Sequence, residues 1–298
     1  MKIGIDLGGS HIAVGVIQEN NIIYKVEKDL SEKEKGADNI ISVIINVVNA
    51  LIKENKIKRE DIEIIGIAVP GIIENGKVRK ANNLHIEEIN LKEKFESEFK
   101  GIKINILNDA KAAAIAEKMY GELKNYKNCI MLTMGTGIGG AVFYNDKLLQ
   151  AQNSAGFEVG HMIINKNGKQ CSCGAKGCFE AYGAIRNFRK QVEEYLDREI
   201  TGVELVELLK SPDKNTEIEK MLEEYIDNLA IGISNLSNIF EPEAIALGGS
   251  IVHYKEVILE KLIDKLKNEE YIFNKNNIPT IVMAKLNNDA GMLGATIE

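Results

Sequence analysis

The sequence of 298 residues has no tryptophan, only four prolines and four cysteines, and aromatic residues make up 6% of it. It also lacks an excess of positive charge. With a formal net charge of -7, the chain has no broad positive field to attract nucleic acid or an anionic membrane. Long apolar runs are missing too: residues 40–52 are broken by polar side chains and fall short of the roughly 20 apolar residues of a membrane-spanning helix. Residues 1–6 show no secretory pattern. We therefore expect a cytoplasmic protein that binds neither nucleic acid nor membranes.

The length and composition are those of an ordinary globular protein with two compact lobes, since 45% of the residues are hydrophobic and 27% are charged. Short β-branched runs and one amphipathic run predict the elements of the first lobe. These are an antiparallel meander over 2–6, 12–17 and 22–26, a helix over 37–54, strands over 62–69 and 102–107, and a helix over 110–119.

The second lobe repeats this opening: a strand over 129–133, a glycine turn over 135–140 and a strand over 141–144. A helix with apolar residues from 221 to 240 follows, and then a short strand over 244–247 that ends in another glycine turn. We expect a smaller lobe of residues 1–118, rejoined by a C-terminal helix over 287–298, and a larger lobe of residues 119–286.

Two of the glycine turns are candidate phosphate sites. In the segment 6–10, Gly8 and Gly9 allow a tight turn with accessible N–H groups, Ser10 adds a hydroxyl, and Asp6 could orient Mg²⁺ through water. Each such turn alone could be a plain hairpin turn. Because a second one occurs at 135–140, where Thr136 adds a hydroxyl, the pair indicates a nucleotide held in a cleft between two lobes.

The pair Asn108-Asp109 ends a predicted strand and begins a predicted helix. Either side chain could simply cap the helix. The alternative is catalytic, because phosphoryl transfer to an alcohol needs a carboxylate that orients the hydroxyl and takes its proton.

Three of the four cysteines lie within eight positions, Cys171, Cys173 and Cys178, and Cys129 stands apart. Together with His161 the three offer a closed tetrahedral set of zinc ligands, so the sequence predicts a structural Zn²⁺ site. Buried free thiols or a redox pair are the alternatives, but the Cys-x-Cys spacing suits neither a thioredoxin-type motif nor an unstrained disulfide. Four protein ligands leave no open position for zinc hydrolysis.

Two glutamates flank this segment, Glu158 before His161 and Glu180 after Cys178. Fixed carboxylates suit hydrogen bonding to neighbouring sugar hydroxyls. The alternative is that both are solvated at the surface. Their apolar or small neighbours favour the binding role.

Taken together, these motifs resemble the ROK family (repressor, open reading frame, kinase) over nearly the whole chain. The matching segments are Asp6–Ser10, Asn108–Ala113, Gly135–Gly140, Gly156–Met162, Cys171–Glu180 and Glu241–Gly249. The resemblance implies an α/β chain with the two-lobed actin/hexokinase/Hsp70-like (ribonuclease H-like) fold and an interlobe cleft.

The resemblance also implies roles for single residues. Asp109 would be the catalytic base and Asn108 a sugar ligand. Glu158, His161 and Glu180 would bind the ring hydroxyls, with His161 shared between zinc and sugar. Further sugar contacts would come from Gly71, Asn82 and Asn83, and ATP contacts from Asp6, Gly8, Gly9, Ser10, Gly135, Thr136, Gly137, Gly248 and Gly249. His11 stands where relatives carry Lys or Asn, so we assign no phosphate contact to it.

The function expected from this resemblance is an ATP- and Mg²⁺-dependent hexokinase that phosphorylates the 6-hydroxyl of a hexose, glucose first, and acts as a homodimer. The alternatives are a kinase for N-acetylmannosamine or another N-acetylhexosamine, and a sugar-responsive regulator without a DNA-binding domain. A repressor of this family needs a helix-turn-helix ahead of the first strand, and that strand begins at Lys2. The kinase is therefore the favoured hypothesis.

Overall fold

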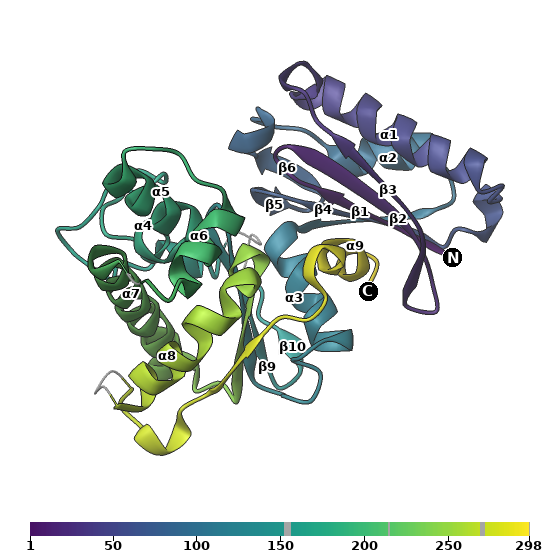
Figure 1. The fold of residues 1–298 in the computed structure, drawn as a ribbon. Coiled ribbons are helices and arrows are strands. Elements are labelled where there is room, and N and C mark those ends of the chain that lie inside the picture. The colour runs from purple at the N-terminus through teal and green to yellow at the C-terminus, as the bar shows by residue number, and fades with distance from the viewer. Residues whose placement is uncertain (152–155, 214, 269–271, 298) are drawn as a thin grey trace. The chain divides into compact units, whose positions relative to one another are not determined.

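A computed structural model describes residues 1–151, 156–213, 215–268 and 272–297. The chain forms two compact units (Figure 1). Unit 1 contains Met1–Tyr120, Gln150–Gly156 and Asn288–Glu298, and unit 2 contains Gly121–Leu149 and Phe157–Asn287. Within the described residues, no helix has both the length and the apolar character needed to cross a membrane.

The sheet of unit 1 has five strands in the order β3-β2-β1-β4-β7. Their bounds are β1 Lys2–Leu7, β2 His11–Gln18, β3 Asn21–Asp29, β4 Ile64–Val69 and β7 Lys103–Asn108. Strands β1, β2 and β3 pair antiparallel, which confirms the predicted meander, and β4 and β7 run parallel to β1. After β4 the chain makes a small hairpin, β5 Ile72–Glu74 and β6 Lys77–Lys80, that the sequence analysis did not predict.

Helices cover both faces of this sheet. Isoleucines of the strands pack with α1 Ala37–Glu54 and α2 Leu91–Glu98 in one core, and the prediction for α1 is confirmed. The other side carries α3 Asp109–Tyr120 and the short α9 Ala290–Ala295, which follows a 3-10 turn over Asn287–Asp289. Helix α9 lies directly on the strands: a Cβ at Gly66 would be 2.2 Å from the Ala295 carbonyl oxygen. Position 66 of β4 therefore requires glycine.

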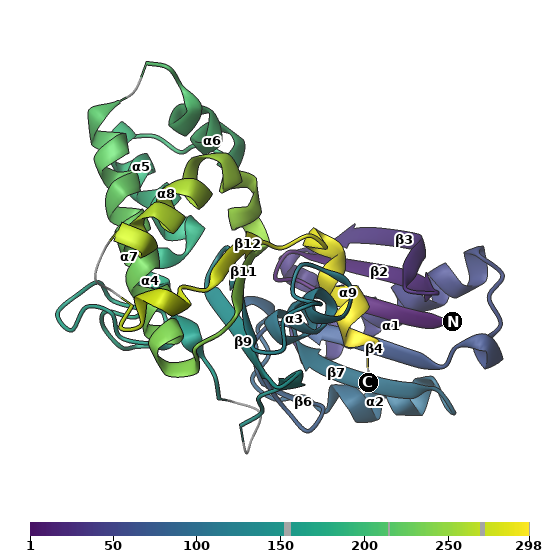
Figure 2. The same cartoon turned by 90° about the horizontal axis from the view of Figure 1, so that it is seen from below.

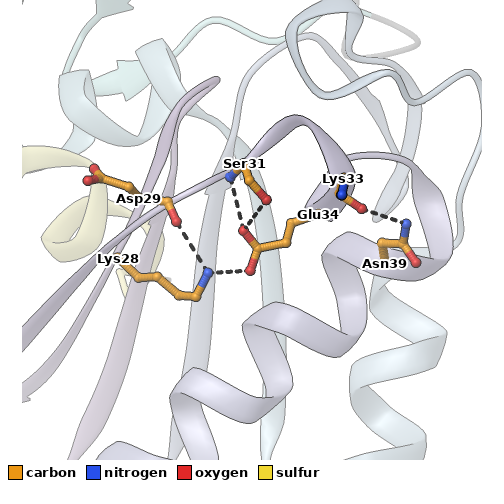
Figure 3. Close-up of polar contacts among 6 residues, drawn as sticks. All are labelled: Lys28, Asp29, Ser31, Lys33, Glu34 and Asn39. Atoms are coloured by element: carbon orange, nitrogen blue, oxygen red, sulfur yellow. Dashed lines mark hydrogen bonds and ion pairs between the residues drawn. The ribbon is translucent and has the colours of Figure 1, made fainter.

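Polar contacts fix the connection from β3 to α1 (Figure 3). Ser31 donates to Glu34 Oε2 from its backbone N at 2.9 Å and from its Oγ at 2.7 Å, and Lys28 pairs with Glu34 Oε1. The hydrogen bond from Lys28, followed by those from Ser31, lowers the pKa of Glu34 to about 2. The Glu34 carboxylate therefore caps the start of the 3-10 turn Glu32–Glu34, which precedes α1.

The sheet of unit 2 repeats the same strand order, as β10-β9-β8-β11-β12. The bounds are β8 Cys129–Met134, β9 Ile138–Tyr144, β10 Lys147–Leu148, β11 Ala244–Gly248 and β12 Thr280–Met283. The prediction of a turn over all of 135–140 is wrong, because β9 already begins at Ile138. Gly139 and Gly140 pair with Thr133 and Leu132 of β8, so the turn itself is 135–137.

The remaining helices of unit 2 build its large apolar core. They are α4 Phe179–Gly183, α5 Ile185–Leu196, α6 Gly202–Lys210, α7 Thr216–Phe240 and α8 Lys255–Asn268. Helix α7, whose side-chain cap is Asn215, contains the predicted apolar stripe and ends before Pro242. It packs against α8 (Figure 2). Short 3-10 helices at Asn82–Leu84, Val159–His161 and Gly249–Tyr254 carry several of the predicted site residues.

Candidate active site

In unit 1, the predicted polar residues gather at the carboxyl ends of three parallel strands. Asp6 is the penultimate residue of β1 and pairs with Ala68 of the neighbouring β4. On the other side of β4, Val69 pairs with Asn108, the last residue of β7. Since parallel strands end at the same edge of a sheet, the chain places Asp6 and Asp109 within electrostatic reach of each other.

Asp109 is the first residue of α3, as predicted, and its side chain is half-buried. Its Oδ1 accepts a hydrogen bond from the backbone N of Ala110 at 2.8 Å. Asn108 Oδ1 accepts from the backbone N of Lys111 at 3.2 Å, so both side chains also help to satisfy the start of the helix. Burial raises the pKa of Asp109. A carboxylate with a raised pKa is a better proton acceptor than one in water.

Asn108 also holds the loop after β4. Its Nδ2 donates to the carbonyl oxygen of Gly71 at 3.0 Å. Gly71 has a φ of +99°, and a Cβ there would lie 2.1 Å from the Lys80 carbonyl oxygen of β6. This position therefore requires glycine on two counts, conformation and space. The structure thus brings together two of the predicted sugar contacts, Gly71 and Asn108.

Asp6 lies in a confined, acidic setting. Burial, followed by the charge of Asp109, raises the pKa of Asp6 to about 7, against a smaller opposing effect of Lys25. Helix α9 closes this side: a Cβ at Gly291 would be 2.7 Å from Asp6 Oδ2. A divalent cation would relieve the cost of two neighbouring carboxylates, so the residues present fit the Mg²⁺ expected of Mg·ATP. Gly291 and Lys25 were not among the predicted site residues, because neither belongs to a recognisable motif.

The first glycine turn lies beside the same edge. The backbone N of Gly8 donates to the His11 carbonyl oxygen at 2.9 Å, and Ser10, which is exposed, lies between them. A Cβ at Gly9 would be 3.0 Å from Asn83 Cβ, so the structure brings Asn83 to this turn. Asn82 is the exposed residue before Asn83 in the 3-10 helix Asn82–Leu84.

In unit 2, the other two glycine turns meet at the carboxyl ends of β8 and β11. Gly248 of β11 pairs with Thr133 of β8. Gly249, with a φ of +79°, comes so close that a Cβ would lie 2.8 Å from the Met134 carbonyl oxygen. Ser250 Oγ donates to the same oxygen at 3.4 Å. The observed turn at 135–137 and the predicted turn at 248–249 therefore form one surface, which also includes Ser250, a residue that was not predicted to belong to the site.

The turn at 135–137 has a defined shape. The backbone N of Gly135 donates to the Gly137 carbonyl oxygen at 3.0 Å, and the backbone N of Arg186 donates to the Gly135 carbonyl oxygen at 3.1 Å. Thr136, between them, is exposed. A fixed glycine turn with an exposed hydroxyl at its tip can donate hydrogen bonds to an anion.

The predicted zinc ligands converge. One ligand atom each from His161, Cys171, Cys173 and Cys178 lies within 4.8 Å of all the others. His161 Nδ1 is 3.7 Å from Cys171 Sγ, and Cys173 Sγ is 3.7 Å from Cys178 Sγ. Ligands at about 2.3 Å from a zinc ion stand about 3.8 Å apart at the corners of a tetrahedron. The four residues therefore fit the metal, while Cys129 is buried in β8.

The neighbouring thiols of this cluster affect the pKa of Cys178. Burial, followed by hydrogen bonds with Cys171 and Cys173, raises the pKa of Cys178 to about 12. Because zinc coordinates the thiolate, a bound cation would favour loss of this proton. Two glycines shape the loop: Gly174 has a φ of +97°, and Gly177 has a φ of +80° and would carry a Cβ 1.7 Å from the Asn165 carbonyl oxygen.

The two predicted glutamates differ. Glu158 is exposed and precedes the 3-10 helix Val159–His161, where its carbonyl oxygen accepts from the His161 backbone N at 3.0 Å. Glu180 is half-buried and held by protein donors: its Oε2 accepts from the Ile138 backbone N at 3.0 Å, and its Oε1 accepts from Ser172 Oγ at 2.9 Å. Glu180 is therefore not a freely solvated glutamate.

The fold and these two groups of residues define a two-unit α/β protein with duplicated five-stranded sheets of the actin/hexokinase type. The family model "ROK family" matches residues 2–297, and the chain belongs to this family. A glucokinase of Thermotoga maritima is 30% identical, over 98% of this chain and 95% of the relative. A xylose repressor of Caldicellulosiruptor bescii is 29% identical, over 98% of this chain and 76% of the repressor.

A solved structure extends the comparison to bound ligands. The ROK family glucokinase of Streptomyces griseus, in complex with glucose and AMPPNP, has a TM-score of 0.79 and 25% identity, and covers 99% of this chain and 97% of its own. The resemblance in fold spans both units of the chain.

Proposed function

We propose that this protein is an ATP-dependent sugar kinase that transfers the terminal phosphoryl group of ATP to the 6-hydroxyl of a hexose, with glucose as the first candidate. One observation carries the proposal: Asp109, half-buried and with a raised pKa, stands beside Asp6 at one sheet edge. Phosphoryl transfer to an alcohol needs one carboxylate for the hydroxyl proton and another near the metal. Full-length similarity to a glucokinase agrees with this chemistry.

In the proposed reaction Asp109 orients the sugar hydroxyl and accepts its proton. The bond from the Ala110 N–H to Oδ1 fixes the carboxylate at the start of α3, and burial makes it more basic. Asp6 would hold Mg²⁺ through water, and the ion would supply charge neutralisation at the phosphates. Asn108 and Gly71, already hydrogen-bonded to each other, would shape the sugar site together with Asn82 and Asn83.

We assign the phosphates of ATP to the first two glycine turns of the chain. Gly8, Gly9 and Ser10 supply one, and Gly135, Thr136 and Gly137 supply the other. The neighbouring Gly248 and Gly249 would take the adenosine side. Backbone N–H groups and hydroxyls are the donors that phosphate oxygens accept in such turns.

Zinc would stabilise the segment that presents the sugar ligands. His161, Cys171, Cys173 and Cys178 fill all four positions, so the ion would be structural. Glu158, His161 and Glu180 would bind the ring hydroxyls. Fixing such groups in place before the sugar arrives lowers the entropy cost of binding.

A screen of phosphoryl transfer from Mg·ATP tests the proposal, with glucose, mannose, allose, fructose, N-acetylglucosamine and N-acetylmannosamine as acceptors. We expect turnover with glucose. Turnover confined to an N-acetylhexosamine would support the alternative substrate class. If none of these sugars is phosphorylated, the proposal is wrong.

A second candidate is a sugar-responsive regulator, which the similarity to the xylose repressor favours. Calorimetry separates the two, because a regulator binds a sugar but does not consume ATP in its presence. The homodimer and the cytoplasmic location expected from the sequence remain predictions, and light scattering on the purified protein would test the first.

A further inference from the structure

We propose that Ser172 is a positioning residue for ATP, acting through Glu180 on the glycine turn at 135–137. Ser172 lies between two zinc ligands, and nothing in the family motif marks it. The inference rests on the proposed function only in taking this turn as a phosphate site. It adds a physical connection between the zinc segment and that turn, which we call the Glu180 bridge: Ser172 Oγ, the Glu180 carboxylate and the Ile138 backbone N.

The carboxylate of Glu180 uses both oxygens to join segments that are distant in sequence. Oε2 accepts from the Ile138 backbone N at 3.0 Å, and Oε1 accepts from Ser172 Oγ at 2.9 Å. Ile138 is the first residue of β9 and directly follows the turn. Both bonds end on a carboxylate, an acceptor that makes stronger hydrogen bonds than a neutral group does. The Ser172 hydroxyl therefore fixes one end of a group whose other end holds the turn.

The turn is built to receive this carboxylate. A Cβ at Gly137 would lie 2.3 Å from Glu180 Oε2, so any side chain there would displace it. The backbone of Glu180 is fixed as well, because its carbonyl oxygen accepts from Asn187 Nδ2 at 3.0 Å and from the Ala184 backbone N at 3.2 Å. With the backbone fixed, the position of the carboxylate depends on its own hydrogen bonds.

Ser172 is not itself one of the predicted metal ligands, although its Oγ also lies 4.0 Å from Cys171 Sγ. It is exposed, and its neighbours Cys171 and Cys173 supply the sulfurs of the predicted site. Cys171 Sγ also lies 3.8 Å from Glu180 Oε1. Because a zinc-bound thiolate has no proton to donate, the Ser172 hydroxyl is the donor that persists whether or not the metal is bound. We therefore expect that removing the Ser172 hydroxyl interrupts the Glu180 bridge while zinc stays bound.

The experiment compares Ser172→Ala and Ser172→Thr with the wild type, and with Lys176→Ala as a matched change of an exposed residue in the same loop. For Ser172→Ala we expect the KM for ATP to rise about threefold to tenfold, with kcat less affected. The exchange of the Ile138 amide hydrogen should become faster. Ser172→Thr, which keeps the hydroxyl, should restore both values, and all four proteins should contain equal zinc.

Gly137→Ala tests the bridge from its other end and serves also if Ser172→Ala folds poorly. It should accelerate exchange at Ile138, and in the double variant with Ser172→Ala the two effects should be less than additive, because both act on one carboxylate. Additive effects would overturn the proposal.

Failure of the bridge and failure of the proposed function give different results. If the wild type phosphorylates no sugar, the function is wrong, and amide exchange at Ile138 still decides whether the bridge exists. If the wild type is a kinase but Ser172→Ala leaves the KM for ATP and the exchange rate at their wild-type values, Ser172 has no positioning role.

Discussion

The two sheets share one strand order, yet the groups at their carboxyl ends differ. In each sheet a three-stranded antiparallel part is followed by two parallel strands. The penultimate residue of the first strand is Asp6 in β1 and Thr133 in β8. The fourth strand leads to a glycine with positive φ in both units, Gly71 and Gly249. The frame is thus duplicated, while the carboxylate of unit 1 is replaced by a neutral hydroxyl in unit 2.

The fifth strand makes the difference larger. In unit 1, β7 leads directly into Asp109, whereas in unit 2, β12 leads to Ala284, whose backbone N donates to Leu247. The end of the first sheet therefore gathers acids that can hold a cation and take a proton. The end of the second offers glycines and hydroxyls that can donate to an anion. The same strand order thus presents different chemical groups at the ends of the two sheets.

The largest loss of activity is expected for Asp109→Asn. If Asp109 is the base, kcat should fall by about 10³-fold while the KM for the sugar changes little, because the amide still occupies the site but accepts no proton. Steady-state kinetics with the sugar found by the screen measures both.

Asp38→Asn is the matched control, since Asp38 also lies in the first turn of a helix of unit 1. It removes a helix N-terminal charge without a catalytic role, so its kcat should equal that of the wild type. Near-wild-type kcat in Asp109→Asn would mean that the acids of unit 1 do not perform the chemistry.

The second prediction concerns the cost of keeping two acids together. Asp6→Asn should lower activity by about 10²-fold through loss of the metal contact, yet stabilise the folded protein in the absence of Mg²⁺. The pKa of Asp6 is raised from 3.8 to about 7, so between these values the folded state keeps a proton that the unfolded chain has lost. The wild-type free energy of unfolding therefore falls as pH rises through this window.

The stabilisation by Asp6→Asn should thus be near zero at about pH 4 and reach ~1–2 kcal/mol at about pH 8. Denaturant titrations of both proteins at the two pH values measure it. Saturating Mg·ATP should reverse the ranking by stabilising the wild type more. If Asp6→Asn and the wild type have the same free energy of unfolding at both pH values, the buried Asp6 does not destabilise the folded protein.

Much of the fold and of the candidate site of unit 1 could be predicted from local sequence. Alternating apolar residues identified the strand that ends near Asp6, and the amphipathic pattern identified α1 with its observed bounds, Ala37–Glu54. Asn108-Asp109 was correctly placed at a strand-to-helix boundary. Each of these depends on the properties of neighbouring residues, which a sequence displays directly.

Features that depend on distant residues were missed. Gly139 and Gly140 look like turn residues, but pairing with β8 makes them part of a strand. The contacts from Ser250 to Met134 and from Ile138 to Glu180 join residues 116 and 42 positions apart. No local pattern encodes such contacts, because they form only when whole strands and helices pack.

The third prediction tests the feature of unit 2 that has no counterpart among the described residues of unit 1, the cysteine cluster. Cys173→Ser should abolish zinc binding and raise the KM for the sugar about tenfold. Because Cys173 is exposed, a loss of packing would not explain such a result. The control is Cys129→Ser, which changes a fully buried cysteine outside the cluster and should leave the zinc content unchanged. Elemental analysis of the purified proteins gives the metal content. Full zinc content in Cys173→Ser would reject the proposed ligand set.

Ser250→Ala tests the proposed role of the two glycine turns of unit 2 in binding ATP, and its effect should be small. Ser250→Ala removes one weak hydrogen bond, the 3.4 Å contact to the Met134 carbonyl oxygen that joins the two glycine turns. The turns remain packed through Gly249, so we expect the KM for ATP to rise only about twofold, with the KM for the sugar unchanged. Ser237→Ala, which removes a buried hydroxyl bonded to the Ile233 carbonyl oxygen within α7, should leave both values unchanged. A change in the KM for the sugar, with the KM for ATP unchanged, would contradict the assignment of these two turns to ATP.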